Sequence, residues 1–135
     1  MGICNPTIEY LTKDLEKKGP VSEASVKQFL ADLDFTPPAD YLQFITNHNG
    51  AEGPVNESYL QILLIEELVK YNKMYGADIN APGYFVFGSN LGGTAYAFDK
   101  KGDKIVAFEF VDMVSEDIQI LGKDFLSFLQ KLAEM

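Results

Sequence analysis

Hydrophobic residues recur at intervals of three and four positions through the first third of the chain, which predicts amphipathic helices. A first helix is predicted over 6–18, where a Gly-Pro pair stops it. A second begins after Ser22, a residue type that caps helix N-termini, and a third follows two prolines at 37–38. The third is expected to end at a structural turn, Asn49-Gly50, because glycine readily adopts the backbone conformation that follows a last helical turn.

The later part of the chain changes to the two-residue alternation of β-strands. Residues 50–58, rich in Gly, Pro, Asn and Glu, are expected to form a loop, and residues 76–83 another. Strands are predicted over 59–64, 84–87, 94–99 and 104–110. The helix expected between the first two strands has one apolar face, made by Leu64, Leu68, Tyr71 and Tyr75. A closing helix after Gly122 has another, made by Phe125, Phe128, Leu129 and Leu132.

The strand predicted over 94–99 carries side chains of different size on its two faces. Thr94, Tyr96 and Phe98 point one way, and the small residues Ala95 and Ala97 point the other. Because the sequence contains no repeat or linker, these elements predict a single α+β domain over 1–135. Its helices come first, a central antiparallel sheet of about four to five strands is flanked by helices, and one C-terminal helix closes the fold.

Charge narrows the classes of partner. The 135 residues include 20 acids and 11 bases, which give a formal net charge of −9, and every base is a lysine. Phosphate contacts dominate nucleic-acid affinity, and arginine is the residue best suited to bidentate contacts, so we expect no nucleic-acid partner. An acidic surface suits a basic protein partner, because the electric field speeds their encounter. In a plainer alternative, the net charge only keeps the protein soluble.

The sequence also predicts a compartment. No apolar run approaches the roughly 18 residues of a membrane span. The N-terminus lacks the basic start and apolar stretch of a secretory signal. Cys4 is the only cysteine, so no internal disulfide can form. A lone thiol without a secretory signal fits a reducing compartment, and we therefore expect a cytoplasmic protein with no membrane contact.

A glycine-rich stretch over 87–96 raises the question of phosphate binding. Gly88 and Gly93 match the G-x-x-x-x-G frame of a phosphate loop, but that loop requires a lysine and then a helix. Here Thr94 follows and begins a predicted strand, which excludes the phosphate loop. We interpret the stretch as a turn between strands whose residues accept a positive φ at little cost: Gly88, Asn90, Gly92 and Gly93.

The remaining candidates for chemistry are isolated. His48 is the only histidine and lies on the apolar side of a predicted helix, where a capping or core-edge role is favoured over catalysis. Asp99 and Asp103 lack the D-x-D-x-D-G order of a calcium loop. The acidic pairs Glu66-Glu67 and Glu116-Asp117 are adjacent residues, so the two carboxylates of each pair do not share a face. We therefore expect no enzymatic activity, no cofactor and no metal site.

Three motifs, in this order, resemble those of one protein family. The first is P-x-D-Y-L-x-F followed by N-G, here residues 38–44 and 49–50. The second is F-G-S-(D/N)-x-G-G-x-x-Y-x-F-D, here residues 87–99, and the third is the F-x-x-F spacing at 125–128. Together they make the chain resemble the SUKH superfamily, in its Smi-type branch, over 22–132. The first predicted helix is then an extension of the SUKH-like domain.

The resemblance implies a strongly curved antiparallel sheet flanked by helices. It also implies an immunity protein, since most bacterial members bind and neutralise a toxin domain, often a nuclease or a deaminase. A stoichiometric complex with a basic cognate toxin agrees with the acidic composition, and the free protein is expected to be a monomer or a weak homodimer. Eukaryotic relatives are regulatory binding modules, so a regulatory or scaffold module with an endogenous partner is the alternative. A hydrolytic or small-ligand protein that uses carboxylates is a distant third.

The expected contact surface is the sheet face near the glycine turn, together with the loop after Asn49-Gly50. The candidate partner-binding residues combine acids, one amide and one tyrosine: Asp40, Glu52, Glu57, Asn90, Tyr96 and Asp99. Contact surfaces in the family vary with the toxin, so these residues are predicted from their type and place in the sequence.

Overall fold

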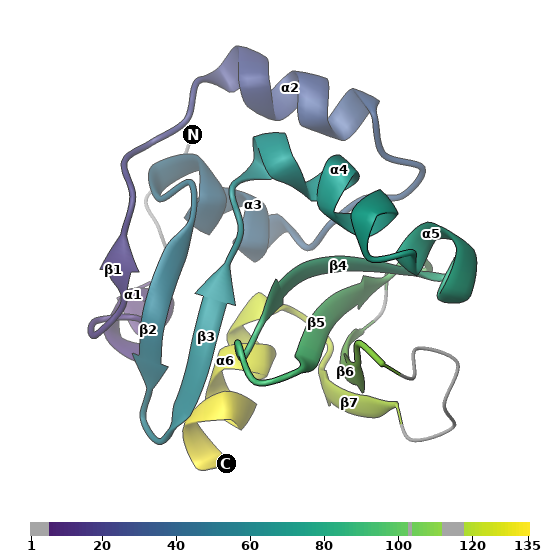
Figure 1. Cartoon of the computed structure of the whole chain (residues 1–135). Helices are drawn as coiled ribbons and strands as arrows, with labels where there is room; N and C mark the ends of the chain where they lie inside the picture. Colours follow the sequence, from purple (N-terminus) through teal and green to yellow (C-terminus); the bar gives the residue numbers. More distant parts are fainter. Residues whose placement is uncertain (1–5, 103, 112–117) are drawn as a thin grey trace.

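Helices and strands come in blocks along the chain (Figure 1), and the structure, a computed structural model, describes residues 6–102, 104–111 and 118–135. The helices are α1 (Pro6–Leu11), α2 (Glu23–Ala31), α3 (Ala39–Asn47), α4 (Ile65–Met74), α5 (Ala77–Asn80) and α6 (Phe125–Glu134). The strands are β1 (Glu16–Lys17), β2 (Ala51–Val55), β3 (Ser58–Ile62), β4 (Tyr84–Ser89), β5 (Thr94–Asp99), β6 (Ile105–Glu109) and β7 (Gln119–Gly122).

The strands form one sheet whose order follows the sequence, and every neighbouring pair is antiparallel. β3 and β4 pair through two residue pairs, Gln61–Ser89 and Ile62–Gly88. The sheet bends strongly at this junction, so that β1–β3 form one wing and β4–β7 the other (Figure 1). The predicted α+β fold with an antiparallel sheet is confirmed, but the described residues form seven strands rather than four to five.

The helix predicted over 6–18 is wrong in its second half. α1 ends at Leu11, and the chain turns into the edge strand β1. Leu15 is still buried, as the helical pattern required, but it packs beside β2. A side chain at Gly53 of β2 would lie 3.0 Å from the carbonyl oxygen of Asp14 and 3.1 Å from the Cα of Leu15. Because glycine has no side chain, β2 can approach this turn closely at Gly53. Hydrophobic spacing does not reveal such a long-range contact.

The loop predicted over 50–58 is also wrong, because most of it is β2. Its residues alternate between buried and exposed, and the exposed ones are Glu52 and Pro54. The small and turn-forming residues of this segment concealed a strand pattern that ends at Asn56, whose φ is +56°. The loop predicted over 76–83 contains α5, and β7 was not predicted. Some residues discussed above lie outside the described ranges: Cys4, Asp103, Glu116 and Asp117.

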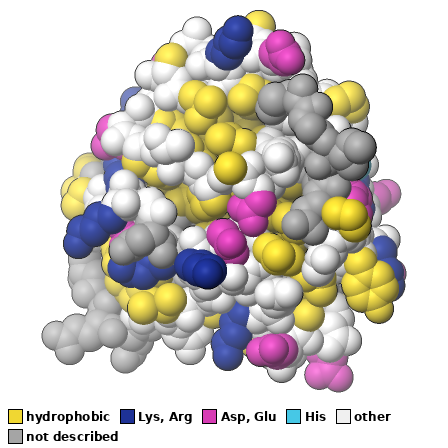
Figure 2. Space-filling view, turned by 180° about the vertical axis from the view of Figure 1, so that it is seen from behind, with side chains coloured by type: hydrophobic (Ala, Val, Ile, Leu, Met, Phe, Trp, Pro, Cys, Tyr) yellow, Lys and Arg dark blue, Asp and Glu magenta, His cyan; other side chains and the backbone are white. Residues whose placement is uncertain are grey.

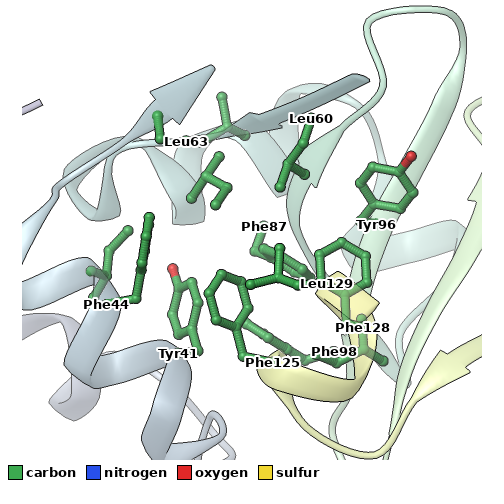
Figure 3. Packing of buried hydrophobic residues seen from close by; sticks show 14 of the residues in the cluster. Tyr41, Phe44, Leu60, Leu63, Phe87, Tyr96, Phe98, Phe125, Phe128 and Leu129 are labelled. Carbon is green, nitrogen blue, oxygen red and sulfur yellow. The ribbon is translucent and has the colours of Figure 1, made fainter. Parts of the chain in front are cut away.

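The larger hydrophobic cluster lies between the sheet and helices α1, α2, α3, α4 and α6, on what we call the inner face. Phe87 of β4 and Phe98 of β5 stack with ring centroids 4.2 Å apart and planes only 8° from parallel. Phe128 of α6 meets Phe87 edge-on at 5.4 Å, and Tyr41 of α3 meets Phe98 edge-on at 4.8 Å. Figure 3 shows Tyr41 between the rings of Phe44 and Phe125. This aromatic packing joins α3 and α6 to the central strands.

The opposite side of the sheet, the outer face, carries a smaller cluster on the second wing only. Ala95 and Ala97 of β5 lie in it, whereas Tyr96 and Phe98 belong to the larger cluster. The predicted division of strand 94–99 into a large and a small face is thus confirmed for these four residues. Ala77 of α5 and Ala81, the residue that follows α5, belong to the smaller cluster, so this segment covers part of the outer face.

Candidate protein-binding face

The two predicted turns have structural roles that the sequence indicated only in part. In the first, the side chain of Asn49 accepts a hydrogen bond from the amide of Ile65 at 3.0 Å and donates one to Glu66 at 2.6 Å. Asn49 therefore fixes the first turn of α4, and Gly50 has a φ of +106°. This turn positions both β2 and α4.

The second turn, over 88–93, holds its shape through Asn90. The side-chain oxygen of Asn90 accepts from the amides of Gly92 and Thr94, at 2.7 and 3.1 Å. Of the predicted positions, only Gly93 has a positive φ, +105°. The other positive φ of this turn, +59°, is at Leu91, which was not predicted. Gly88 is required for a different reason, because a Cβ there would collide with a carbonyl oxygen of β3. Because Gly88 has no side chain, β3 can lie close to β4 at this point.

Asp40 forms hydrogen bonds within the fold. Its carboxylate accepts hydrogen bonds from the backbone amides of Phe125 and Leu126, at 3.1 and 2.9 Å. Asp124 accepts from the third free amide of the same helix, that of Ser127, at 2.8 Å. The N-terminus of α6 is thereby capped by two carboxylates, an arrangement that also suits the positive end of the helix dipole. Asp40 joins α3 to α6, and a contact with a partner stays a prediction.

Asp99 is similarly committed to the β5–β6 hairpin and is only 5% exposed. It accepts from the amide of Lys101 at 2.9 Å and forms an ion pair with the ammonium group of Lys104 at 3.1 Å. Burial opposes its ionisation, but these hydrogen bonds and the two lysine charges outweigh burial and lower the pKa of Asp99. The arrangement fixes the turn between the strands.

Tyr96 lies on the inner face, 4% exposed, with its ring edge-on to Phe128 at 5.1 Å. Burial raises the pKa of its phenol. Its oxygen points away from the aromatic cluster (Figure 3), toward a hollow of about 350 Å³ that Asn90 and Glu109 also line. The structure thus brings two predicted site residues, Asn90 and Tyr96, to one hollow. The hollow is separate from the other four candidates.

Glu52 and Glu57 are the predicted residues that stand exposed on the first wing. Glu57 lies in the β2–β3 turn, and Glu52 lies on the outer face of β2. The strand register continues across the sheet as one outer-face row: Glu16, Glu52, Gln61, Ser89, Ala95 and Phe108. This row changes from charged on β1 and β2 to apolar on β5 and β6. The apolar end is covered by α5, and the charged end is exposed.

A groove of about 580 Å³, here called the β1–β3 groove, follows the charged end toward the first turn of α4. Its side-chain lining includes Glu16, Glu52, Gln61, Leu64 and Glu67. Lys17 and Lys18 also line it, although the ammonium group of Lys17 is bound to Glu9 at 3.1 Å. The elements that supply this lining, β1–β3 and the start of α4, lie side by side in Figure 1.

The carboxylate of Glu52 receives only neutral donors among the described residues. The hydroxyl of Tyr59 donates to it at 2.8 Å, and the amide of Gln61 donates at 3.4 Å. The pKa of Tyr59 is raised, first by the hydrogen bond to Glu52, and further by the charges of Glu52 and Glu16. The negative charges of Glu16 and Glu52 therefore both lie near this exposed tyrosine.

Sequence reasoning missed four residues of this face: Glu16, Tyr59, Gln61 and Glu67. Glu16 was placed in a helix, and its neighbour Glu52 in a loop, so their pairing across two strands was hidden. A usable signal was present in 51–55, where small and polar residues alternate in a way that suits a strand.

The back of the molecule differs from this face. Seen from behind, it shows a band of hydrophobic side chains interrupted by acidic and basic ones (Figure 2).

His48 follows the last residue of α3. Its ring packs against Phe44, and its Nε2 lies 3.2 Å from Glu9. The core-edge position predicted for His48 is confirmed.

Within the described ranges, no three His, Cys, Asp or Glu side chains gather in a way that suits a metal ion. No helix of the described residues is both long and apolar enough to cross a membrane.

These features define an α+β domain built on one meandering antiparallel sheet, with an uncovered polar wing. The model of the SMI1 / KNR4 family (SUKH-1) matches residues 20–131, and the chain therefore belongs to this family. The match agrees with the resemblance seen over 22–132 and leaves α1 and β1 outside it. The comparison with curated proteins gave no match.

Proposed function

We propose that this protein is an immunity protein, which binds a cognate toxin domain in a stoichiometric complex and neutralises it without turnover. The observation that carries the proposal is the uncovered, glutamate-lined β1–β3 groove on a chain of the SUKH-1 family. Immunity against toxins is the function that family resemblance implies, and an exposed acidic face suits a basic toxin of the nuclease or deaminase type. The proposed site of action is the cytoplasm, where such toxins reach their substrates.

Electrostatics supplies a mechanism for rapid binding. A net charge of −9 attracts a basic domain over distances of about a Debye length, roughly 8 Å at physiological ionic strength. Fast association suits an immunity protein, because a toxin must be captured before it acts. The close contact then depends on a smaller set of buried residues, as in other protein interfaces.

Co-expression tests the proposal directly. A candidate toxin domain encoded by a neighbouring gene is produced in cells with and without the protein, and cell survival and co-purification are measured. Survival with a one-to-one complex by calorimetry is expected, together with an association rate that falls as salt rises. Cell death despite comparable expression, or failure to form a complex, would contradict the immunity function. Capture of an endogenous protein without protection would instead favour the regulatory module.

A further inference from the structure

The outer face of the first wing contains an arrangement that is unfavourable for the isolated protein. Glu16 of β1 and Glu52 of β2 are directly opposite each other in the antiparallel register, so both side chains lie on the outer face. Like charges that face each other across two strands destabilise a sheet. None of the described lysines forms an ion pair with either glutamate, and Lys17 is bound to Glu9 instead.

The surroundings of this pair hold the carboxylate of Glu52 in place. Tyr59 and Gln61 donate hydrogen bonds to the two oxygens of Glu52, so its side chain is oriented before any partner arrives. Such pre-organisation lowers the entropy cost of binding. Tyr59 is itself 40% exposed, and tyrosine is one of the residue types enriched among binding hot spots. A rigid aromatic ring therefore lies beside the charged pair.

The shape of the face favours an extended occupant. The β1–β3 groove runs from the glutamate pair to Glu67 in the first turn of α4, with Leu63 and Leu64 in its wall. A long aliphatic side chain with a terminal cation matches this lining, since its methylene groups pack on leucine while its charge reaches a carboxylate. Lysine and arginine are the residues with this chemistry. The other lining cation, Lys18, selects against an occupant with cations along its whole length.

We propose that the β1–β3 groove is the docking site for a lysine- or arginine-bearing segment of the toxin domain, whose cation sits between Glu16 and Glu52. This inference rests on the proposed immunity function and names the surface that performs it. The binding of a cation at this point relieves the repulsion between the two glutamates. The strand β1, which supplies Glu16, lies outside the family match, so this half of the site belongs to the chain's own extension.

A double variant, Glu16→Gln with Glu52→Gln, tests the site in the full chain. Glutamine keeps the acceptor for Tyr59 but removes both charges. The matched control is Glu23→Gln with Glu134→Gln, which makes the same change in net charge at exposed positions of α2 and α6. The groove variant is expected to bind the toxin domain at least about tenfold more weakly than wild type, and the control within about twofold. The unfolding temperature of the groove variant should stay unchanged or rise, because the like-charge pair is gone.

The outcomes separate the two proposals. If wild type protects cells and binds the toxin but the groove variant binds equally well, the docking site is wrong and the immunity function stands. If wild type neither binds nor protects, the immunity function is wrong, and a short peptide with a single arginine among uncharged residues then decides about the groove. In a titration followed by NMR at low salt, amide shifts should concentrate at Glu16, Glu52 and Gln61. Two results would overturn the docking site. One is amide shifts that spread over all acidic surfaces, and the other is a groove variant that changes the self-association of the protein instead of its binding.

Discussion

On the inner face of the sheet, Tyr96 and Phe98 of β5 are buried under α3 and α6, whereas on the outer face of β2 Glu52 stands in solvent beside Glu16. The inner face consists of aromatic rings in contact with helices from both ends of the chain. The outer face of the first wing consists of polar side chains in a groove. This difference indicates that the inner face supplies the free energy of folding and the outer face of the first wing is available for binding.

The largest effect on the free energy of unfolding is expected at the inner face. Phe128 contacts the rings of Phe87, Tyr96 and Phe125, and it is fully buried. Phe128→Ala is expected to lower the free energy of unfolding by about 3–5 kcal/mol, through lost burial and the cavity left behind. Urea unfolding followed by circular dichroism measures this loss. Tyr59→Ala on the outer face is the control and should cost less than about 1 kcal/mol. Equal losses would contradict the division between the faces.

A second prediction concerns the junction between the wings. The side chain of Asn72 on α4 accepts from the amide of Val86 at 2.8 Å and donates to its carbonyl oxygen at 2.9 Å. Asn72 thereby takes the place of a neighbouring strand where β3 and β4 diverge. Asn72→Ala leaves two buried backbone groups unpaired and is expected to cost about 2–4 kcal/mol. Hydrogen exchange should accelerate at the Val86 amide.

The control for this variant is Asn47→Ala on α3. Asn47 makes one local hydrogen bond, to the carbonyl oxygen of Gln43 at 2.8 Å. Its loss should cost less than about 1 kcal/mol. If Asn72→Ala costs no more than Asn47→Ala, the side chain of Asn72 does not support β4.

Sequence reasoning succeeded where one local pattern determines the structure. The strand predicted over 94–99 has the bounds of β5, and the apolar stripe of the closing helix is the buried side of α6. It failed where a distant contact decides. Leu15 continues the helical spacing of Ile8 and Leu11, but residues 16–17 pair with β2 as a strand, and Gly53 leaves room for the turn before them. Periodicity within a segment contains no information about such contacts.

The candidate site shows the same limit. All four acids were predicted as partner contacts, but only Glu52 and Glu57 are exposed. Asp40 and Asp99 accept hydrogen bonds from backbone amides of the fold. Whether a carboxylate is structural or available depends on which amides the fold brings to it. The sequence does not state this, because the amides of α6 are 85 positions away from Asp40.

A third, smaller effect compares two carboxylates that were predicted together. The pKa of Asp99 is lowered, so its ionised form stabilises the fold at pH values above its unfolded pKa of about 3.9. This stabilisation is lost as the pH falls below that value. Asp99→Asn is expected to cost about 1–3 kcal/mol at neutral pH, and the difference from wild type should shrink in acid. Urea unfolding at neutral and acidic pH measures it.

Glu52→Gln provides the comparison on the outer face. Its effect on stability should be small or favourable at neutral pH, because the substitution removes one charge of the Glu16–Glu52 pair. A loss for Glu52→Gln as large as that for Asp99→Asn would mean that Glu52 is structural too.

The smallest expected effect on stability concerns one unfavourable arrangement on each face of the sheet. On the inner face it is the hydroxyl of Tyr41, which is buried with no hydrogen-bond partner among the described residues, and burial raises its pKa strongly. Tyr41→Phe removes the unpaired hydroxyl and keeps the ring contacts, so stability should rise by about 1 kcal/mol. On the outer face, the double variant Glu16→Gln with Glu52→Gln should keep or gain stability. Only the outer-face variant should lose toxin binding, and a Tyr41→Phe protein that binds less tightly, or unfolds more easily, would show that the inner face does more than fold the chain.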